Sequence, residues 1–158
     1  MFIIAVCYDC CMGKSMFHFP VRVYYEDTDA GGVTYYANYL KFCERARTEW
    51  LRHLGFGQQE LANNSGIFFV VRRVEMDYLQ SARLDDALTV SVEVEKLGRV
   101  SIEFFQQIYK GDVLLAQCRT KVGCVSGEVF RPCALPGPIA KAAGGYVRAH
   151  AASASGLK

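Results

Sequence analysis

A strict alternation of apolar and polar residues fills most of the chain after Gly66, and it limits the possible folds more than any other feature of the sequence. The alternation is clearest in residues 88–95, where Leu and Val alternate with Thr, Ser and Glu. Turn-forming sequences interrupt it at Leu97-Gly98-Arg99 and at Lys110-Gly111-Asp112. The pattern predicts four consecutive antiparallel strands, which cover about residues 67–78, 88–95, 100–108 and 113–125.

One helix is expected before these strands. A first strand is predicted at Phe19 to Tyr25, and from Tyr39 the apolar side chains recur at helical spacing as far as Leu54. Asn38 is the expected N-cap, and Gly55 and Gly57 end the helix. The chain should therefore form an α+β fold, an antiparallel sheet of about five strands wrapped round one long central helix. Val and Phe on the other sheet face predict that a second subunit covers it.

Length and composition restrict the class of protein. The 158 residues suit one domain, and a net charge of +2 without a basic cluster argues against a nucleic-acid partner. Met16 directly precedes the first strand, so residues 1–15 are interpreted as an upstream extension and residues 16–139 as the domain. Residues 140–158 lack periodicity and are expected to be a disordered tail. The opening apolar stretch is too short for a signal peptide or a membrane span, which favours a cytoplasmic protein with no integral membrane segment.

The seven cysteines do not suggest a disulfide framework or a metal site. Their number is odd, three of them crowd the N-terminus, and the rest are far apart in apolar contexts. No histidine supplies a second ligand pair at zinc-binding spacing. Reduced thiols are therefore expected, with no metal and no other cofactor.

Residues 25–39, between the first strand and the helix, are the densest cluster of reactive side chains and glycines. A glycine pair allows positive φ, and the free N–H groups of a helix N-terminus stabilise an anion beside them. Two carboxylates, Asp27 and Asp29, lie in this loop. Residue types alone favour turn and capping roles for both of them, so the loop by itself is weak evidence for catalysis.

The full pattern is more specific. YEDTDAGGVTYYANY, followed by LKFCERARTEWLRHLGF and later by VVRRVEMDYLQSARLDDAL, resembles the signature of the hotdog-fold acyl-CoA thioesterases of the YbgC and 4-hydroxybenzoyl-CoA thioesterase type. The resemblance covers about residues 19–136. It implies a hotdog fold, hydrolysis of acyl-CoA with coenzyme A as part of the substrate, and a homodimer or homotetramer whose active sites lie at the dimer interface.

The resemblance also implies roles for individual residues. Asp29 matches the catalytic carboxylate, as nucleophile or as general base. A backbone N–H near Ile67 or Phe68 matches the oxyanion donor. Many YbgC-type enzymes have His at position 36, whereas this chain has the Tyr of the 4-hydroxybenzoyl-CoA branch. The matching substrate-pocket positions are Tyr25, Gly32, Val33 and Tyr36, and the matching coenzyme A positions are Arg99 and Ser101.

Three other functions would make different demands on the sequence. An acyl carrier protein thioesterase would dock its acidic partner on basic residues near Arg72 and Arg83. An interaction protein of the Tol-Pal system would not need the intact Asp29 loop. A hotdog dehydratase would carry a His in the loop or the helix start, and this segment contains none.

Overall fold

The computed structural model describes residues 16–127 and 129–149. The chain begins with strand β1 and a single 3-10 turn, η1, and then forms two helices before the long strands of the sheet. In chain order, the elements are β1 Phe17–Arg22, η1 Tyr25–Asp27, α1 Tyr36–His53, α2 Gln58–Ser65, β2 Ile67–Tyr78, β3 Ala87–Leu97, β4 Ser101–Lys110, β5 Val113–Ser126, β6 Arg131–Pro132 and α3 Gly137–Gly144.

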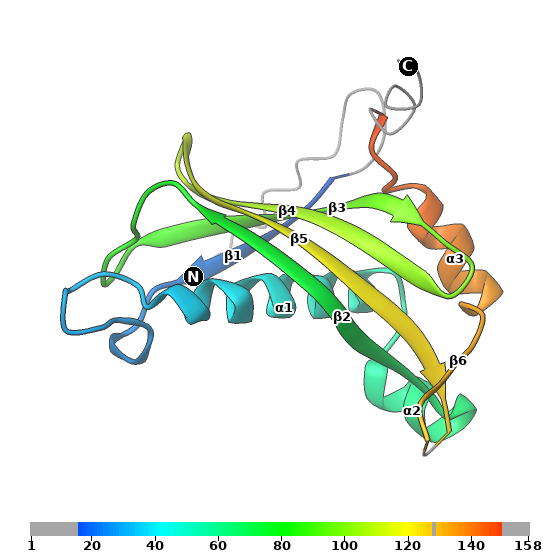
Figure 1. Cartoon of the computed structure of the whole chain (residues 1–158). Coiled ribbons are helices and arrows are strands. Elements are labelled where there is room, and N and C mark those ends of the chain that lie inside the picture. Colours follow the sequence, from blue (N-terminus) through cyan, green and yellow to red (C-terminus); the bar gives the residue numbers. More distant parts are fainter. Residues whose placement is uncertain (1–15, 128, 150–158) are drawn as a thin grey trace, which may run out of the picture.

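A single antiparallel sheet curls over helix α1 (Figure 1). The strand order is β1-β3-β4-β5-β2, and the two-residue β6 pairs with the end of β5. This confirms the predicted hotdog arrangement of one sheet around one long helix. Two shorter helices were not predicted: α2 follows α1 and precedes β2, and α3 lies near the end of β3.

The core lies between α1 and the concave face of the sheet. The apolar stripe of the helix, which includes Phe42, Cys43, Ala46 and Trp50, is almost fully buried. It faces the alternate residues of β3 and β4 whose spacing predicted those strands: Leu88, Val90, Val92, Val94, Ile102, Phe104 and Ile108. Burial of this stripe is the main source of the helix's stability, because in proteins most helical stability comes from packing of an amphipathic face and not from intrinsic helix propensity.

Helix α1 begins without the expected cap. Tyr35 occupies the N-cap position, and no side chain caps the helix. Asn38 lies in the first turn of the helix, where its amide Nδ2 donates a hydrogen bond of 2.7 Å to Asp27 Oδ1. The N-cap prediction for Asn38 was therefore wrong, because a buried carboxylate in the preceding loop takes the amide. Gly57 precedes α2 as its N-cap residue.

The segment after β6 differs from the predicted disordered tail. Residues 137–144 form helix α3, in which Ile139 and Ala143 are completely buried. The ring of Tyr146 packs edge-on against Trp50, and Val147 pairs with Val94 of β3. Residues 140–149 therefore belong to the folded domain, while the rest of the predicted tail and the predicted extension at residues 1–15 lie outside the described residues.

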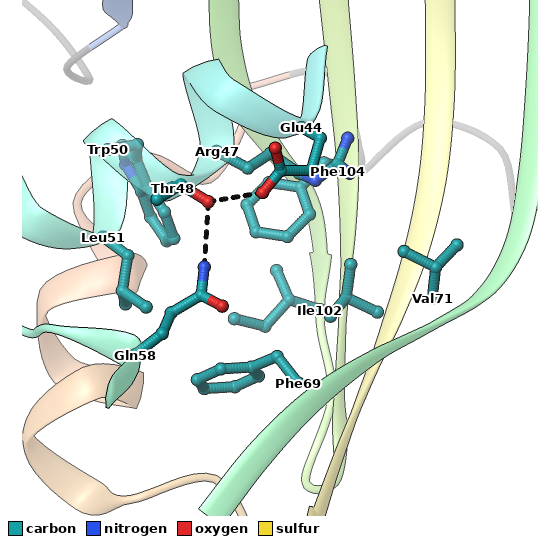
Figure 2. Close-up of a pocket in the computed structure, with 11 residues that line it drawn as sticks. Glu44, Arg47, Thr48, Trp50, Leu51, Gln58, Phe69, Val71, Ile102 and Phe104 are labelled. Atoms are coloured by element: carbon teal, nitrogen blue, oxygen red, sulfur yellow. Dashed lines mark hydrogen bonds between the residues drawn. The ribbon is translucent and has the colours of Figure 1, made fainter. Parts of the chain in front are cut away.

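Strand β2 is the edge of the sheet that α1 covers least. Val71 and Val74 of this strand are 52% and 39% exposed. Between β2 and the C-terminal half of α1, side chains surround a cavity that opens to solvent and has about 540 Å³ of empty space when the adjoining solvent is included (Figure 2). Its walls include Trp50, Phe69 and Phe104.

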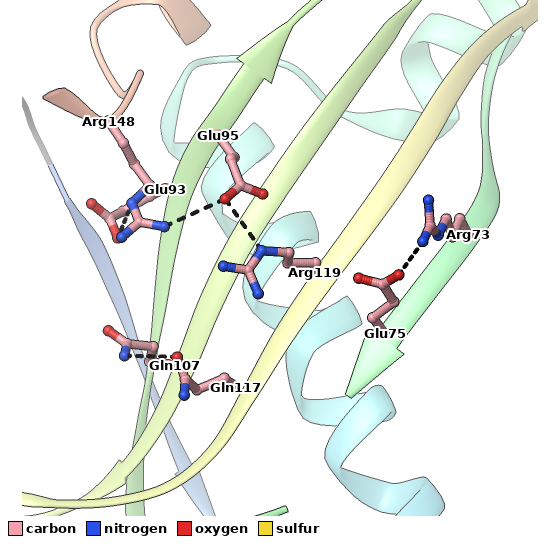
Figure 3. A network of polar contacts seen from close by, with 8 residues as sticks. All are labelled: Arg73, Glu75, Glu93, Glu95, Gln107, Gln117, Arg119 and Arg148. Carbon is pink, nitrogen blue, oxygen red and sulfur yellow. Dashed lines mark hydrogen bonds and ion pairs between the residues drawn. The ribbon is translucent and has the colours of Figure 1, made fainter. Parts of the chain in front are cut away.

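The convex face of the sheet is polar, contrary to the expectation of an apolar face awaiting a second subunit. Arg148 lies 3.5 Å from Glu93 and 3.7 Å from Glu95, and Glu95 also accepts a hydrogen bond from Arg119 (Figure 3). Phe105 is buried beneath the guanidinium groups of Arg119 and Arg148. The exposed apolar surface of the sheet thus lies along β2, not on its convex face.

Candidate active site

The loop between β1 and α1 is organised by a buried carboxylate. Asp27 is only 2% exposed, and its Oδ2 accepts a hydrogen bond of 2.8 Å from the backbone N–H of Tyr24. Its Oδ1 accepts from Asn38, and its carbonyl accepts from the N–H of Tyr35. Asp27 therefore ties both ends of the loop to the start of α1, and its carboxylate is occupied by structural contacts.

Asp29 lies in the tight turn that this scaffold presents. Its N–H donates to the carbonyl of Val33, its carbonyl accepts from the N–H of Gly32, and its Oδ1 accepts from the N–H of Gly31 at 2.8 Å. Gly32 has φ of +72°, which favours glycine. At Gly31 a β-carbon would lie only 3.1 Å from Asp29 Oδ1. The glycine pair therefore fixes an exposed carboxylate in one orientation, with Oδ2 free of hydrogen bonds to the described residues.

Asp29 lines a cavity at the N-terminal end of α1 that opens to solvent and has about 610 Å³ of empty space when the adjoining solvent is included. Aromatic side chains form much of its wall: the rings of Tyr36 and Tyr78 meet edge to face, and the Tyr78 hydroxyl donates to the carbonyl of Tyr36 at 3.0 Å. The remaining lining residues are Val33, Thr34, Tyr39, Leu79, Gln80 and Ser81.

Two tyrosines near the Asp29 loop, Tyr35 and Tyr78, have raised pKa values and stay protonated at neutral pH. The pKa of Tyr35 is raised above its usual value, first by the neighbouring Tyr36 hydroxyl and also by the negative charge of Asp29. Partial burial raises the pKa of Tyr78. Both rings are therefore neutral, and neither adds a negative charge next to the carboxylate.

The predicted site residues divide into two groups. Asp29, Val33 and Tyr36 line one cavity. Gly32 does not line this cavity, but its positive φ shapes the turn that carries Asp29. Tyr25 lies in the same loop, is 81% exposed and does not line the cavity either. Phe68, Arg99 and Ser101 lie at the opposite end of the sheet: Phe68 pairs with Val125, and Ser101 pairs with Gly123 two residues away along β5. Within one chain they are remote from Asp29.

Other lining residues were missed. Tyr39 was interpreted only as part of the helix's apolar stripe, and Tyr78 only as the end of a strand. Leu79, Gln80 and Ser81 follow β2 in a segment without periodicity, and only the backbone path brings them to α1. The N–H of Thr34 donates to the carbonyl of Ala82, and the hydroxyl of Tyr39 accepts from the N–H of Ala82. These contacts hold the segment against the Asp29 loop.

Two negative findings concern the described residues. None of their His, Cys, Asp and Glu side chains gather in groups of three or more that could hold a metal ion. No helix in the described part of the chain has the length and apolarity needed to cross a membrane.

Comparison with known proteins places this geometry in a family. Residues 31–117 match the model of the thioesterase superfamily. The chain is 48% identical over 120 residues to the acyl-CoA thioesterase YbgC of Haemophilus influenzae, covering 76% of this chain and 88% of that protein. It is 38% identical over 125 residues to the acyl-CoA thioesterase YbgC of Helicobacter pylori, covering 73% and 90%.

A solved structure agrees with these sequence matches. The crystal structure of a probable thioesterase from Bartonella henselae superimposes with a TM-score of 0.73 at 35% identity. The match covers 77% of this chain and 100% of that one. With the single curled sheet and these relatives in agreement, the chain belongs to the thioesterase superfamily and, within it, to the YbgC-type thioesterases.

Proposed function

We propose that this protein hydrolyses acyl-CoA thioesters to a free acid and coenzyme A, with Asp29 as its catalytic carboxylate. The observation that carries the proposal is the position of Asp29, which is fixed by Gly31 at the rim of a cavity beside the N-terminus of α1. The names of the Haemophilus and Helicobacter relatives support an acyl-CoA substrate.

The geometry suits either of two routes. As nucleophile, Oδ2 of Asp29 attacks the thioester carbon, coenzyme A leaves as its thiolate, and water then hydrolyses the anhydride. As general base, Asp29 takes a proton from a water molecule that attacks the same carbon directly. In both routes the thioester oxygen gains negative charge. The uncapped N-terminus of α1 offers free backbone N–H groups and the positive end of the helix dipole to that oxygen.

A homodimer would complete the site. Helix α1 and strand β2 run in opposite directions, since Tyr78 at the end of β2 contacts Tyr36 at the start of α1. A two-fold axis through the middle of β2 would pair this strand with its copy in antiparallel orientation. Phe68 of one subunit would then lie toward Asp29 of the other and supply a backbone N–H for the oxyanion. Arg99 and Ser101, at the same end of the sheet as Phe68, would lie near the phosphates of coenzyme A.

Replacement of Asp29 by Asn tests the proposal directly. Asn keeps the size of the side chain and an oxygen that can accept from Gly31, but it removes the negative charge and the basicity. We expect kcat to fall roughly 100-fold or more with little change in KM, measured by release of the free thiol from a panel of short, long and aromatic acyl-CoAs.

Asp112→Asn is the matched control, because Asp112 is an exposed carboxylate in the turn between β4 and β5. It should leave kcat unchanged. Near wild-type turnover in a folded Asp29→Asn protein would rule out this loop as the catalytic centre. Turnover of acyl carrier protein thioesters alone would change the substrate assignment but not the role of Asp29.

A further inference from the structure

Arg47 is a half-buried cation in the C-terminal half of α1. Only one of its three guanidinium nitrogens has a hydrogen-bond partner among the described residues. Its Nη1 donates to Gln106 Oε1 at 2.8 Å and to Thr120 Oγ1 at 3.3 Å. Gln106 is completely buried and is itself held by the carbonyl of Cys43. Neutral acceptors on two strands thus fix the guanidinium, and no carboxylate forms an ion pair with it in the described part of the chain.

This guanidinium lines the cavity between α1 and β2 (Figure 2). The walls are largely apolar, with the side chains of Trp50, Leu51, Phe69, Ile102, Phe104 and Val122. A polar chain lies along one side: Gln58 donates to Thr48, and Thr48 donates to Glu44. Arg47 is the only cation among the residues that line this cavity. The cavity is suited to an apolar group that carries a hydrogen-bond acceptor for Arg47.

The charges around the cavity decide which acceptor fits. Burial lowers the pKa of Arg47, the sign of a charged group that has lost hydration without full compensation. A further hydrogen-bond acceptor in the cavity would replace part of the hydrogen bonding to water that Arg47 has lost. Glu44 lines the same cavity, so its negative charge would oppose a bound carboxylate. A neutral acceptor, such as a ketone oxygen, meets the requirement of Arg47 without repulsion from Glu44.

The cavity at Asp29 and the cavity at Arg47 lie on the same side of α1, one at each end of the helix. The first includes Asp29, Tyr36 and the end of β2, and the second includes Arg47 and the start of β2 at Phe69. The two-fold axis proposed above exchanges the ends of β2. It therefore places the Arg47 cavity of one subunit next to Asp29 of its partner, where the acyl group of a thioester would extend.

We propose that Arg47 determines acyl specificity by selecting acyl groups that carry a neutral hydrogen-bond acceptor on an otherwise apolar chain. The inference rests on the proposed thioesterase function and adds a substrate class to it.

Three acyl groups of nearly the same shape distinguish a preference for a neutral acceptor from a preference for an apolar group or for a carboxylate. In 4-methylpentanoyl-CoA the chain ends in an apolar branch, 4-oxopentanoyl-CoA replaces one methyl group by a ketone oxygen, and succinyl-CoA ends in a carboxylate. A second series, with one more methylene group, allows for the depth of the cavity. The readout is the ratio of kcat/KM for the oxo and the methyl substrate, measured on one protein preparation, so that a partly inactive preparation does not affect it.

The wild type should prefer the oxo substrate to both the methyl and the carboxylate substrates. Arg47→Met keeps an apolar side chain of similar length without its donors, and we expect it to lower the oxo-to-methyl ratio about tenfold, because hydrogen bonds to charged groups have this magnitude. Arg47→Lys retains a cation and should keep part of the preference. Arg45→Met is the matched control, because Arg45 is an exposed residue of the same helix outside the cavity, and its ratio should equal that of the wild type.

Binding provides a second measurement that does not depend on turnover. Titration of the same acyl-CoAs into Asp29→Asn protein should give a lower Kd for the oxo compound, and the added change Arg47→Met should abolish the difference. A wild-type ratio at or below one in both series overturns the inference even if Arg47→Met does not fold. Good turnover without this preference refutes the role of Arg47 alone, whereas no turnover of any acyl-CoA refutes the proposed function.

Discussion

Asp27 and Asn38 form a buried carboxylate–amide pair that supports the proposed catalytic residue from outside the lining of its cavity. Asp27 accepts hydrogen bonds from the loop and from the first turn of α1, and Asn38 is 4% exposed. Loss of one partner would leave a buried polar group unsatisfied, which costs about 1–3 kcal/mol. The hydrogen bond between Asp27 and Asn38 therefore stabilises the conformation of the turn that carries Asp29.

Replacement of Asn38 by Ala should lower the free energy of unfolding by about 1–3 kcal/mol, because Asp27 Oδ1 loses its buried donor. The looser turn should also reduce kcat for the best acyl-CoA. Urea denaturation and steady-state kinetics measure the two effects. Asn63→Ala, at an exposed position of α2, is the control and should change stability by less than about 0.5 kcal/mol. Equal effects of the two substitutions would contradict the positioning role.

The residues of the Asp29 loop could be predicted because they are contiguous and form one pattern. Asp29, Gly32, Val33 and Tyr36 lie within eight positions of one another. Tyr78 and Arg47 could not be assigned to cavities in the same way. Tyr78 reaches α1 only because the sheet curls, and Arg47 resembles an ordinary charged helix residue until the strand positions of Gln106 and Thr120 are known.

At the scale of elements, α3 completes the core at the C-terminal end of α1. Ile139 is completely buried in the same cluster as Trp50, and Leu135 just before the helix is also buried. The N–H of Leu135 donates to the carbonyl of Arg99, which ties this segment to the turn between β3 and β4. Helix α3 is thus a part of the folded domain that Trp50 needs for its own burial.

Ile139→Ala should lower the free energy of unfolding by about 2–5 kcal/mol, the usual cost of a large-to-small change in a packed core. Thermal and urea denaturation measure this change. Val129→Ala is the control, since Val129 is 72% exposed, and it should have little effect. A small loss of stability at Ile139 would show that α3 contributes little to the core.

The long elements were predictable from periodicity, and α3 was not. A strand of ten residues or an eighteen-residue helix repeats its pattern often enough to be recognised. The eight residues of α3 are GPIAKAAG, in which only Ile139 is a large apolar side chain. The helix is stabilised by contacts with β3 and with the core cluster that contains Trp50. These contacts join residues far apart in the chain, so they leave no periodic pattern in the local sequence.

At the scale of the whole molecule, the apolar surface along β2 is where we propose that a second chain binds. Val71, Val74 and Leu79 are all more than a third exposed in the single chain. The convex face, by contrast, carries the ion pairs of Glu95, Arg119 and Arg148 and needs no cover. Association through β2 would bury this apolar surface and join the two halves of the proposed site.

The protein should therefore have two or four times its chain mass of 17.6 kDa in solution, measured by light scattering at micromolar concentration. Val74→Asp places a charge in the proposed interface and should shift the mass toward 17.6 kDa with loss of activity. Val113→Asp makes the same change at an exposed position of the β4–β5 hairpin and should alter neither. A monomeric wild type, or an active monomeric variant, would exclude the dimer as the functional unit.

The two edges of the sheet are unlike each other. Strand β1 has only six residues and carries Pro20, which lacks the N–H that a further strand would bind. Beyond the first residue of β1, Phe17, residues 146–148 take up the backbone hydrogen-bonding groups of Val94 on β3. Polymerisation by strand addition needs two open edges, and in the described residues only β2 offers a long one. Once two chains pair through β2 by a two-fold axis, each has used its open edge, and the assembly closes instead of growing into a fibre.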